Sequence, residues 1–354
     1  MSDKGLKLDS ALCERIRHAM LSWYRKGHRD LPWRRTNDPY RIWISEIMCQ
    51  QTQVDTVVPR YERFIDRFPN VRALATASEE AVCEEWAGLG YYSRARNLHR
   101  AAGWVVKENG GEMPGSADAL RELPGIGRYT AGAIASIAYG EAAPIVDCNV
   151  ARVLSRLFLV EHAPNSSSGQ RALWALAEQL VPDSDPGAFN QSVMELGALV
   201  CTPKRASCLL CPLRSDCQAR GQGVVDRFPH PKARTPRRLL PLAMAWLEAE
   251  DGSVWLEQRP LEGLWAGLWE LPSADNPVEL ATKLGGVSLS EPVAQVEHTL
   301  SHRDVVVTIH TASAPEAASE RFRLYPDPLS APLSGLARKA IVAAQAATGH
   351  RKTL

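Results

Sequence analysis

The sequence lacks an excess of charge of either sign and lacks any long apolar run. Its 354 residues include 41 Lys or Arg and 40 Asp or Glu, so the formal net charge is +1 at pH 7. Overall charge therefore does not indicate a nucleic-acid partner, and any basic surface has to be local. No segment approaches the roughly 20 apolar residues of a membrane span, and the opening residues are polar, without the apolar stretch of a signal peptide. We expect a cytoplasmic protein that does not contact membranes.

Regular alternation of polar and apolar residues, the pattern of a β-strand, is scarce before residue 220. Residues 1–220 are predicted to form helices joined by short loops. Residues 221–239 are rich in Pro, Gly and Arg and are predicted to be a linker. Residues 240–350 contain two predicted pairs of strands and a closing helix, which indicates a second domain of the α+β class.

Cysteine is unevenly placed, since four of the eight cysteines fall within 17 residues, at Cys201, Cys208, Cys211 and Cys217. A disulfide framework is not expected in a cytosolic chain. Four thiolates at this spacing suit tetrahedral zinc or an iron–sulfur cluster, although the two short-spaced pairs of a zinc ribbon are absent. Four buried free cysteines are the alternative without a metal.

The segment "LPGIGRYTAG", Leu123–Gly132, carries two glycines just before a predicted helix. Gly125 and Gly127 allow the backbone to approach a phosphate, which the N-terminus of the next helix would face. A helix–hairpin–helix element is therefore predicted over about 118–138, and its contact with DNA would be independent of sequence. An ordinary helix–helix turn is the alternative.

Together, the hairpin and the cysteine loop 201–217 resemble the helix–hairpin–helix DNA glycosylases with an iron–sulfur loop, of the endonuclease III type. The resemblance implies that the four cysteines hold a [4Fe–4S] cluster. It also implies that Asp147, in "APIVDCNVARVLSRL", is the shared aspartate of that superfamily. Cys148 stands where a glycine is usual. Asp147 could also act simply as a helix N-cap.

Lysine is missing at position 129, where bifunctional members of the superfamily carry the amine that forms a Schiff base. Tyr129 offers no amine, so the resemblance implies a monofunctional glycosylase in which water completes the reaction. Tyr129 could instead only pack in the groove between the two lobes.

A second carboxylate is found in "WISEIMCQQTQV", where Glu46 is the only acidic side chain between Arg41 and Asp55. An acid in such an apolar helix is expected to have a raised pKa and to deliver a proton, unless it is merely paired in a salt bridge. This segment and "GLGYYSRARNL" resemble the adenine DNA glycosylases, the MutY family, over about residues 29–217. Endonuclease III-like relatives lack the acid.

The resemblance implies hydrolysis of the N-glycosidic bond of adenine mispaired with 8-oxoguanine or guanine in duplex DNA, during base excision repair by a monomeric bacterial protein that acts on the nucleoid. It implies that Glu46 protonates the base and that Asp147 stabilises the sugar cation. Tyr129 and Asn149 would orient Asp147 and the water. Gln51 and Tyr91 would enter the duplex, and Trp33 and Glu195 would lie near the adenine pocket.

The C-terminal domain lacks the Arg-Glu and Glu-Glu metal motif of working Nudix hydrolases, although "EGLWAGLWELPSAD" resembles the Nudix-related tail of the adenine glycosylases. We therefore expect a domain that binds and does not hydrolyse. In that family a Phe-Ser-His pattern recognises 8-oxoguanine. Here Ser301 and His302 match the pattern, and Leu300 replaces the aromatic residue.

Three alternative functions remain open at this point. An endonuclease III-like pyrimidine glycosylase and lyase is disfavoured by Tyr129 and Glu46. A non-catalytic iron–sulfur DNA-binding sensor would be expected if either carboxylate were missing. A Nudix hydrolase with a DNA-binding front end is disfavoured by the missing metal motif.

Overall fold

The chain divides into two compact units, Met1–Ala233 and Arg234–Leu354, in a computed structural model that describes residues 7–231, 236–260, 263–300, 303–313 and 321–349. Each unit is considered by itself. None of the described residues of the first unit forms a strand. Its helices are α1 (Ser10–Gly27), α2 (Pro39–Cys49), α3 (Val54–Arg67), α4 (Val71–Thr76), α5 (Glu79–Glu85), α6 (Ser93–Glu108), α7 (Ala117–Leu120), α8 (Arg128–Tyr139), α9 (Cys148–Phe158), α10 (Ser167–Leu180), α11 (Pro186–Leu199) and α12 (Gln218–Gly221), with short 3-10 turns at Pro32–Arg34, Cys208–Leu210 and Val225–Arg227.

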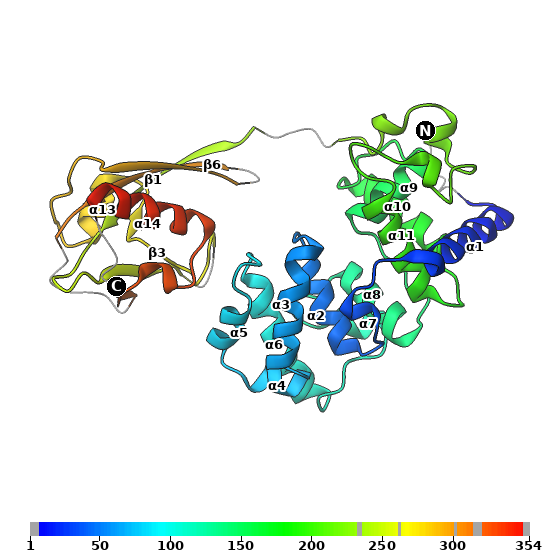
Figure 1. Cartoon of the computed structure of the whole chain (residues 1–354), viewed down its shortest axis with the longest axis horizontal. Coiled ribbons are helices and arrows are strands. Elements are labelled where there is room, and N and C mark those ends of the chain that lie inside the picture. The colour runs from blue at the N-terminus through cyan, green and yellow to red at the C-terminus, as the bar shows by residue number, and fades with distance from the viewer. Residues whose placement is uncertain (1–6, 232–235, 261–262, 301–302, 314–320, 350–354) are drawn as a thin grey trace. The chain divides into compact units, whose positions relative to one another are not determined.

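The first unit has two hydrophobic cores. One is built mainly from α2–α8 and contains large buried side chains such as Trp43, Phe64 and Trp86. The other is built from α1 and α9–α11, and Met20 and Phe189 are among its buried residues. The two groups of helices are visible as separate lobes in Figure 1. Because each large apolar side chain contributes about 1.5–3 kcal/mol on burial, each lobe is stabilised by its own core.

Local sequence explains where the helices next to the later site begin. Asp38 caps α2 by accepting a hydrogen bond from the backbone N–H of Tyr40, and Pro39 occupies the first helical position. Asp147 caps α9 by accepting from the N–H of Val150 at 2.7 Å. Both helices therefore start at a carboxylate whose position is fixed by the backbone.

The predicted hairpin lies between α7 and α8. Gly125 has a φ of +78°, and a Cβ added there would come within 2.7 Å of the Asn97 Cβ. Gly125 is therefore required by both conformation and space. Gly127 has an ordinary φ of −90°, and an added Cβ would meet nothing within 4 Å, so this glycine leaves open space in front of α8.

The second unit contains two sheets and two α-helices among its described residues. The strands are β1 (Arg238–Trp246), β2 (Val254–Gln258), β3 (Trp269–Glu270), β4 (Ser273–Ala274), β5 (Ala294–Thr299), β6 (Arg303–Thr311) and β7 (Phe322–Tyr325), and the helices are α13 (Pro277–Lys283), α14 (Gly335–Thr348) and a 3-10 turn at Pro328–Ser330. One sheet has the order β4-β1-β6-β5 and the other β3-β2-β7. β1 and β6 run parallel, from the pair Arg238–Arg303 to the pair Trp246–Thr311.

The two helices pack on different hydrophobic clusters of this unit. Leu336 and Ile341 of α14 belong to the main core, together with Met244 and Ile309 of the larger sheet. Leu280 of α13 packs with alternate residues of β1 in a smaller cluster. Both faces of β1 are thereby covered, which agrees with the nearly unbroken run of buried residues at its end.

The division between the units falls inside the segment 221–239 that the sequence predicts as a linker. The first part of this segment is held by the helical unit, because Arg156 Nε donates to the carbonyl oxygens of Val225 and Phe228 at 3.2 and 2.9 Å. The last two residues of the segment already belong to β1.

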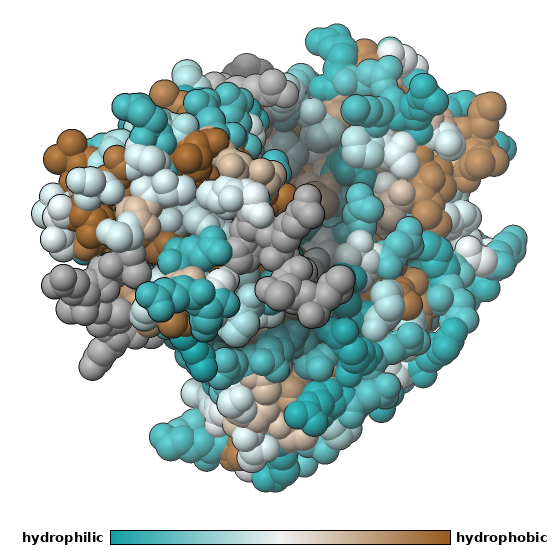
Figure 2. Space-filling view, turned by 60° about the vertical axis from the view of Figure 1, so that its left-hand side comes forward, coloured by the Kyte–Doolittle hydropathy of each residue, from teal (hydrophilic) through white to brown (hydrophobic). Residues whose placement is uncertain are grey.

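The face shown in Figure 2 is mostly hydrophilic, with hydrophobic residues in separate small patches. Large apolar side chains are mainly in the cores, and the most exposed exceptions include Leu209, Leu210 and Val278. In the described part of the chain, no helix has the length and apolar character needed to span a membrane.

Candidate active site

A cavity of about 670 Å³ lies in the first unit between the two helical lobes. Its walls come from α2, from α8, from the start of α9 and from α11. The structure brings together here eight of the twelve predicted catalytic, DNA-binding and pocket residues, namely Trp33, Glu46, Gln51, Gly127, Tyr129, Asp147, Asn149 and Glu195. Gly125 and Tyr91 are not among the lining residues.

Glu46 is a buried acid on α2, with 9% of its surface exposed. Burial raises the pKa of its carboxyl to about 7, and the nearby negative charge of Asp147 acts in the same direction. The Tyr129 hydroxyl donates a hydrogen bond to Glu46 Oε2 at 2.6 Å and opposes the rise. A carboxyl with this pKa is protonated in a large fraction of molecules near neutral pH, so it can act as a general acid.

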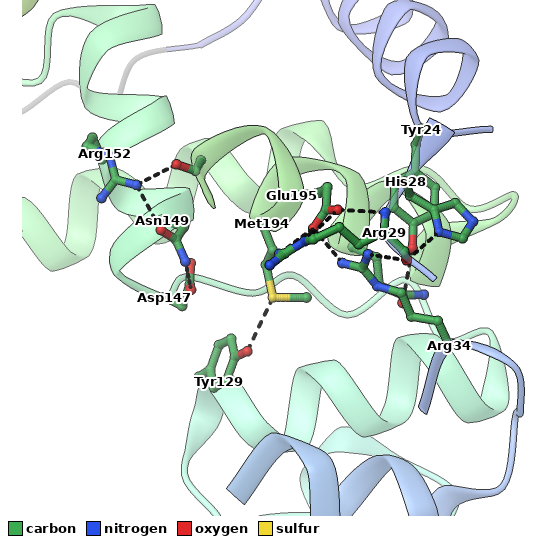
Figure 3. A network of polar contacts seen from close by, with 12 residues as sticks. Tyr24, His28, Arg29, Arg34, Tyr129, Asp147, Asn149, Arg152, Met194 and Glu195 are labelled. Carbon is green, nitrogen blue, oxygen red and sulfur yellow. Dashed lines mark hydrogen bonds and ion pairs between the residues drawn. The ribbon is translucent and has the colours of Figure 1, made fainter. Parts of the chain in front are cut away.

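Tyr129, on the first turn of α8, is hydrogen-bonded to Glu46. Its hydroxyl also lies 3.3 Å from the Met194 sulfur, the contact drawn in Figure 3. Burial raises its pKa well above the usual value, so the phenol keeps its proton and remains a donor. The resemblance implies that Tyr129 orients Asp147 and the water. In the structure its hydrogen bonds are made to the other carboxyl group.

Asp147 is held by donors on both of its oxygens. Oδ1 accepts from the Val150 N–H, and Oδ2 accepts from Asn149 Nδ2 at 3.0 Å (Figure 3). Burial raises the pKa of Asp147, whereas these hydrogen bonds and the charge of Arg152 lower it. Asp147 therefore receives more support for its anionic form than Glu46, whose one hydrogen bond comes from a phenol. Burial outweighs these contributions and the pKa of Asp147 is raised overall, so the anionic role of Asp147 stays a prediction.

Sequence reasoning gave no role to Arg152, which is connected to Asp147 through Asn149. Its Nη2 donates to Asn149 Oδ1 at 2.8 Å and to the Gly197 carbonyl, and its Nε donates to the Cys201 carbonyl at 2.7 Å. The i, i+3 spacing of Asn149 and Arg152 on a helix was the available sequence signal. Hydrogen bonds thus run without a break from Asp147 to the first cysteine of the four-cysteine loop.

Glu195 and Trp33 lie in the cavity wall but already have protein partners. The Glu195 side chain is fully buried and accepts from the Arg29 backbone N–H, from the Arg29 guanidinium and from Arg34 (Figure 3). Although burial acts in the opposite direction, these donors hold the pKa of Glu195 at about 2. Trp33 packs edge-on against Tyr61 at 5.2 Å between ring centroids. Glu195 therefore joins α11 to the segment before α2.

Glu195→Gln is expected to lower the free energy of unfolding by about 3 kcal/mol, because the partly exposed Arg29 and the largely buried Arg34 lose their buried counter-charge. The wild-type contribution should be present above pH 4.5 and be lost as the pH falls toward 2, since the folded-state pKa is depressed. Urea unfolding at pH 7 measures the effect. Glu178→Gln, which breaks the exposed pair with Arg128, is the control and should change stability by less than about 1 kcal/mol. An equal effect of the two substitutions would contradict a structural role for Glu195.

Gln51 and Tyr91 lie in two loops, the first after α2 and the second before α6. Both have left-handed backbone conformations, with φ values of 55° and 49°. Both side chains are exposed, and the exposed fraction of Tyr91 is 59%. Such conformations are uncommon for residues other than glycine, and they occur where surrounding contacts determine them.

All four cysteines of the 201–217 loop line one small cavity, together with the side chain of Arg156. Arg156 Nη1 lies 3.3 Å from Cys201 Sγ and also donates to the Thr202 carbonyl at 2.8 Å. Within the described ranges, no three His, Cys, Asp or Glu side chains are close enough to hold a single metal ion. Four thiols lining one shared space match the donor type and number of an iron–sulfur cluster, which cysteine thiolates hold.

Ser301 and His302 lie outside the described residues. Leu300 and Arg303 on either side of them are joined by a hydrogen bond from the Leu300 N–H to the Arg303 carbonyl at 2.8 Å. The Leu300 side chain is partly buried and packs against the core of the second unit.

A helical unit with a helix–hairpin–helix and a two-carboxylate cavity, followed by an α+β unit, defines a base excision DNA repair protein with a Nudix-type domain. Residues 44–179 match the HhH-GPD superfamily of base excision DNA repair proteins, and residues 243–347 match the NUDIX domain. The predicted fold class is thereby confirmed. The chain belongs to the adenine DNA glycosylase family, as the following similarities show.

The chain is 33% identical over 290 residues to the adenine DNA glycosylase of Buchnera aphidicola subsp. Acyrthosiphon pisum, which covers 80% of this chain and 82% of the relative. It is 44% identical over 327 residues to the human adenine DNA glycosylase, which covers 77% of this chain. The chain spans 60% of the length of that human relative.

Solved structures show the same helical fold. A thermostable thymine-DNA glycosylase aligns with a TM-score of 0.56 and 30% identity over 60% of this chain and 100% of its own. An endonuclease III trapped as a covalent intermediate with DNA aligns with a TM-score of 0.52 and 22% identity over 61% of this chain and 99% of its own. At that identity the second likeness concerns the fold alone.

Proposed function

We propose that this protein is a monofunctional adenine DNA glycosylase that hydrolyses the N-glycosidic bond of adenine opposite 8-oxoguanine or guanine in duplex DNA. The observation that carries the proposal is the pair of buried carboxyl groups in one cavity, Glu46 with a pKa of about 7 and Asp147 with donors on both oxygens. The similarity to proteins named adenine DNA glycosylase supports the choice of base.

The cavity suits a base that has left the double helix. Adenine inside a duplex cannot be reached, so the nucleotide has to rotate out of the base stack into a pocket. The space of about 670 Å³ is open enough to admit it. Gln51 and Tyr91 would fill the position that the base leaves, which offsets part of the cost of unstacking.

Each carboxyl group then has its own task. Glu46 gives its proton to N7 of adenine, so that the base leaves as a neutral molecule. Asp147, as the anion, stabilises the positive charge that develops on the sugar, and water completes the hydrolysis. This is the division of labour between two carboxyl groups in glycoside hydrolysis. Tyr129 holds Glu46 in place, and Asn149 and Arg152 hold Asp147.

The residues around the cavity favour a hydrolytic reaction over a lyase reaction. Among the described residues that line it, the cations are Arg29, Arg34 and Arg128, and none is a lysine. Arginine stays protonated in proteins and does not form Schiff bases. The endonuclease III-like alternative needs such an amine.

One chain supplies both carboxyl groups and all four cysteines, which supports a monomer.

The test is the identity of the released base. Duplexes with adenine opposite 8-oxoguanine, adenine opposite guanine, and thymine glycol are incubated with the protein, and free bases are quantified by mass spectrometry. Release of adenine from the first two supports the proposal. Release of the oxidised pyrimidine would favour the endonuclease III-like alternative, and tight binding without any release would favour a DNA-binding sensor.

We further propose that Cys201, Cys208, Cys211 and Cys217 hold a [4Fe–4S] cluster. Bound there, the cluster would cross-link the loop, and the exposed cations Lys204 and Arg205 on the same loop would then face DNA phosphates. Iron–sulfur groups also supply electron transfer, which the two-carboxylate reaction does not require.

Protein purified without oxygen is expected to contain about four iron and four sulfide per chain, as a [4Fe–4S] cluster requires. The measurement is metal analysis together with acid-labile sulfide. Substitution of Cys208 by Ser should lower both contents, whereas substitution of Cys83, which is remote in sequence from the loop, should leave them unchanged. About one zinc per chain and no sulfide would contradict the cluster.

The second unit is proposed to recognise 8-oxoguanine, with Ser301 and His302 contacting the lesion. A chain ended after Ala233 should still release adenine, but its preference for 8-oxoguanine over guanine should fall about five- to tenfold, the worth of one or two hydrogen bonds. Single-turnover rates and Kd values on both duplexes measure this preference. An unchanged preference would show that the second unit does not read the lesion.

A further inference from the structure

Arg94, on the first turn of α6, is bound to two separate loops through one guanidinium group. Its Nη1 donates to the carbonyl oxygens of Ile47, Met48 and Gln50 at 2.8, 3.1 and 2.5 Å. Its Nη2 donates to Thr52 Oγ1, Leu89 O and Gly90 O at 3.2, 2.9 and 3.1 Å. No part of this arrangement is expected from the position of Arg94 in the sequence.

The first set of contacts closes the C-terminus of α2. The last carbonyl groups of a helix have no partner within the helix, and a cation placed there satisfies them and the helix dipole. Because α2 also carries Glu46, the same guanidinium fixes the end of the helix that holds the acid. Thr130 Oγ1 accepts from Gln50 Nε2 at 3.3 Å and connects this end to α8.

The second set of contacts fixes the loop that precedes α6. The carbonyl groups of Leu89 and Gly90 come immediately before Tyr91, and the Arg94 guanidinium lies 5.7 Å from the centre of the Tyr91 ring. The guanidinium also lies 5.4 Å from the centre of the Trp86 ring. Thr52 Oγ1 also lies 3.5 Å from Leu89 O, so the two loops touch directly beside Arg94.

The two left-handed residues adjoin the carbonyl groups that Arg94 binds. Gln51 follows Gln50, and Tyr91 follows Gly90. An unfavourable backbone conformation persists where the surrounding contacts determine it, and here one side chain supplies such contacts for both residues.

We propose that Arg94 is a positioning residue that holds Gln51 and Tyr91 as a single wedge at a fixed place relative to Glu46. The inference rests on the proposed function, in which these two side chains enter the duplex. Arg94 does not contact Glu46 itself, and its contacts place the wedge against the end of the helix that carries this acid. Lysine in place of Arg94 keeps the charge, but its single ammonium group cannot donate to both loops in the same geometry.

The experiment compares Arg94→Lys with Arg63→Lys, which alters an exposed pair with Glu85 elsewhere in the same lobe. The first measurement is the rise in fluorescence of 2-aminopurine placed next to the target adenine, which reports unstacking without requiring release of a base. The second is the single-turnover rate of adenine release from two substrates. One is a fully paired duplex with adenine opposite 8-oxoguanine, and the other presents the adenine in a bulge, already unstacked.

Arg94→Lys is expected to suppress the fluorescence rise and to slow release from the paired duplex about 10- to 100-fold, as a displaced positioning group does. Release from the bulge should change by less than about threefold, because extrusion is no longer needed there. Arg63→Lys should behave as the wild type. If Arg94→Lys does not fold, Thr52→Val, which removes one shared contact, should show the same pattern at about 3- to 10-fold.

A normal fluorescence rise in a folded Arg94→Lys protein would overturn the inference. Equal losses on the paired and bulged substrates would also overturn it, since they would place the effect on the acid and not on the wedge. Failure of the proposed function looks different, because wild-type protein would then release adenine from neither substrate while the fluorescence measurement still reports on Arg94.

Discussion

Glu46→Gln is expected to lower the single-turnover rate of adenine release by about 10²–10⁴-fold, the usual contribution of a general acid. The amide has nearly the same shape and can still accept the hydrogen bond from Tyr129, so binding of the lesion duplex should be retained. The measurement pairs a binding titration with a single-turnover assay on adenine opposite 8-oxoguanine. Substantial remaining release would remove Glu46 from its role.

The pH dependence of the same reaction gives an independent control. Burial raises the pKa of Glu46 from the ordinary 4.5 to about 7, and the protonated form is the active one. The rate should therefore be high below pH 6 and fall about tenfold for each pH unit well above 7, as expected for a single ionisation. The residual rate of Glu46→Gln should lack this decline. A wild-type rate that increases through pH 7 would require a base in place of the acid.

Asp147→Asn is expected to reduce adenine release by about 10²–10³-fold, because the positive charge on the sugar loses its counter-charge. Asparagine is as good an N-cap as aspartate, so α9 should begin at the same place and the fold should be preserved. The rate is measured under single-turnover conditions, and thermal unfolding checks the fold.

Asp9→Asn is the matched control for this substitution. Asp9 also caps a helix, since it accepts from the Leu12 N–H at 3.2 Å at the start of α1, but it is not among the residues that line the cavity. Its substitution should leave the rate unchanged. If Asp147→Asn were equally harmless, Asp147 would be only a helix cap.

Local features of the chain were predictable from the sequence. The helix starts at Asp38 and Asp147 follow from capping preferences, and the turn at Gly125 follows from the need for a positive φ. Glu46 stood out because an acid within an apolar helix is unusual, whereas Asp147, in the ordinary place of an N-cap, was singled out by the resemblance of its segment to the superfamily. Each of these inferences used residues within one turn or one helix.

Contacts between distant segments could not be derived in this way. Tyr129 and Glu46 are 83 residues apart, and the phenol could equally have reached Asp147. Glu195 is joined to Arg29 across 166 residues. The sequence indicated a place for Glu195 near the pocket but did not indicate that it links two segments. Such pairs depend on how the helices pack, which local periodicity does not specify.

The second unit shows the same limit. Four of its strands, β1, β2, β5 and β6, were predicted from alternation, whereas the short strands β3, β4 and β7 were not. The parallel pairing of β1 with β6 and the placement of β1 and β2 in different sheets were not predicted either. Parallel neighbours need a long connection, and here more than 50 residues of chain intervene. Strand order is set by packing of both faces and not by the strands themselves.

The most direct measurement is a single-turnover reaction on a duplex with adenine opposite 8-oxoguanine, analysed on parallel gels with and without alkali treatment. A monofunctional glycosylase that uses Glu46, Asp147 and water leaves an intact strand with an abasic site. The account therefore predicts adenine release with strand breaks only after alkali. Strand breaks without alkali would mean that an amine of the chain attacks the sugar, and would contradict it.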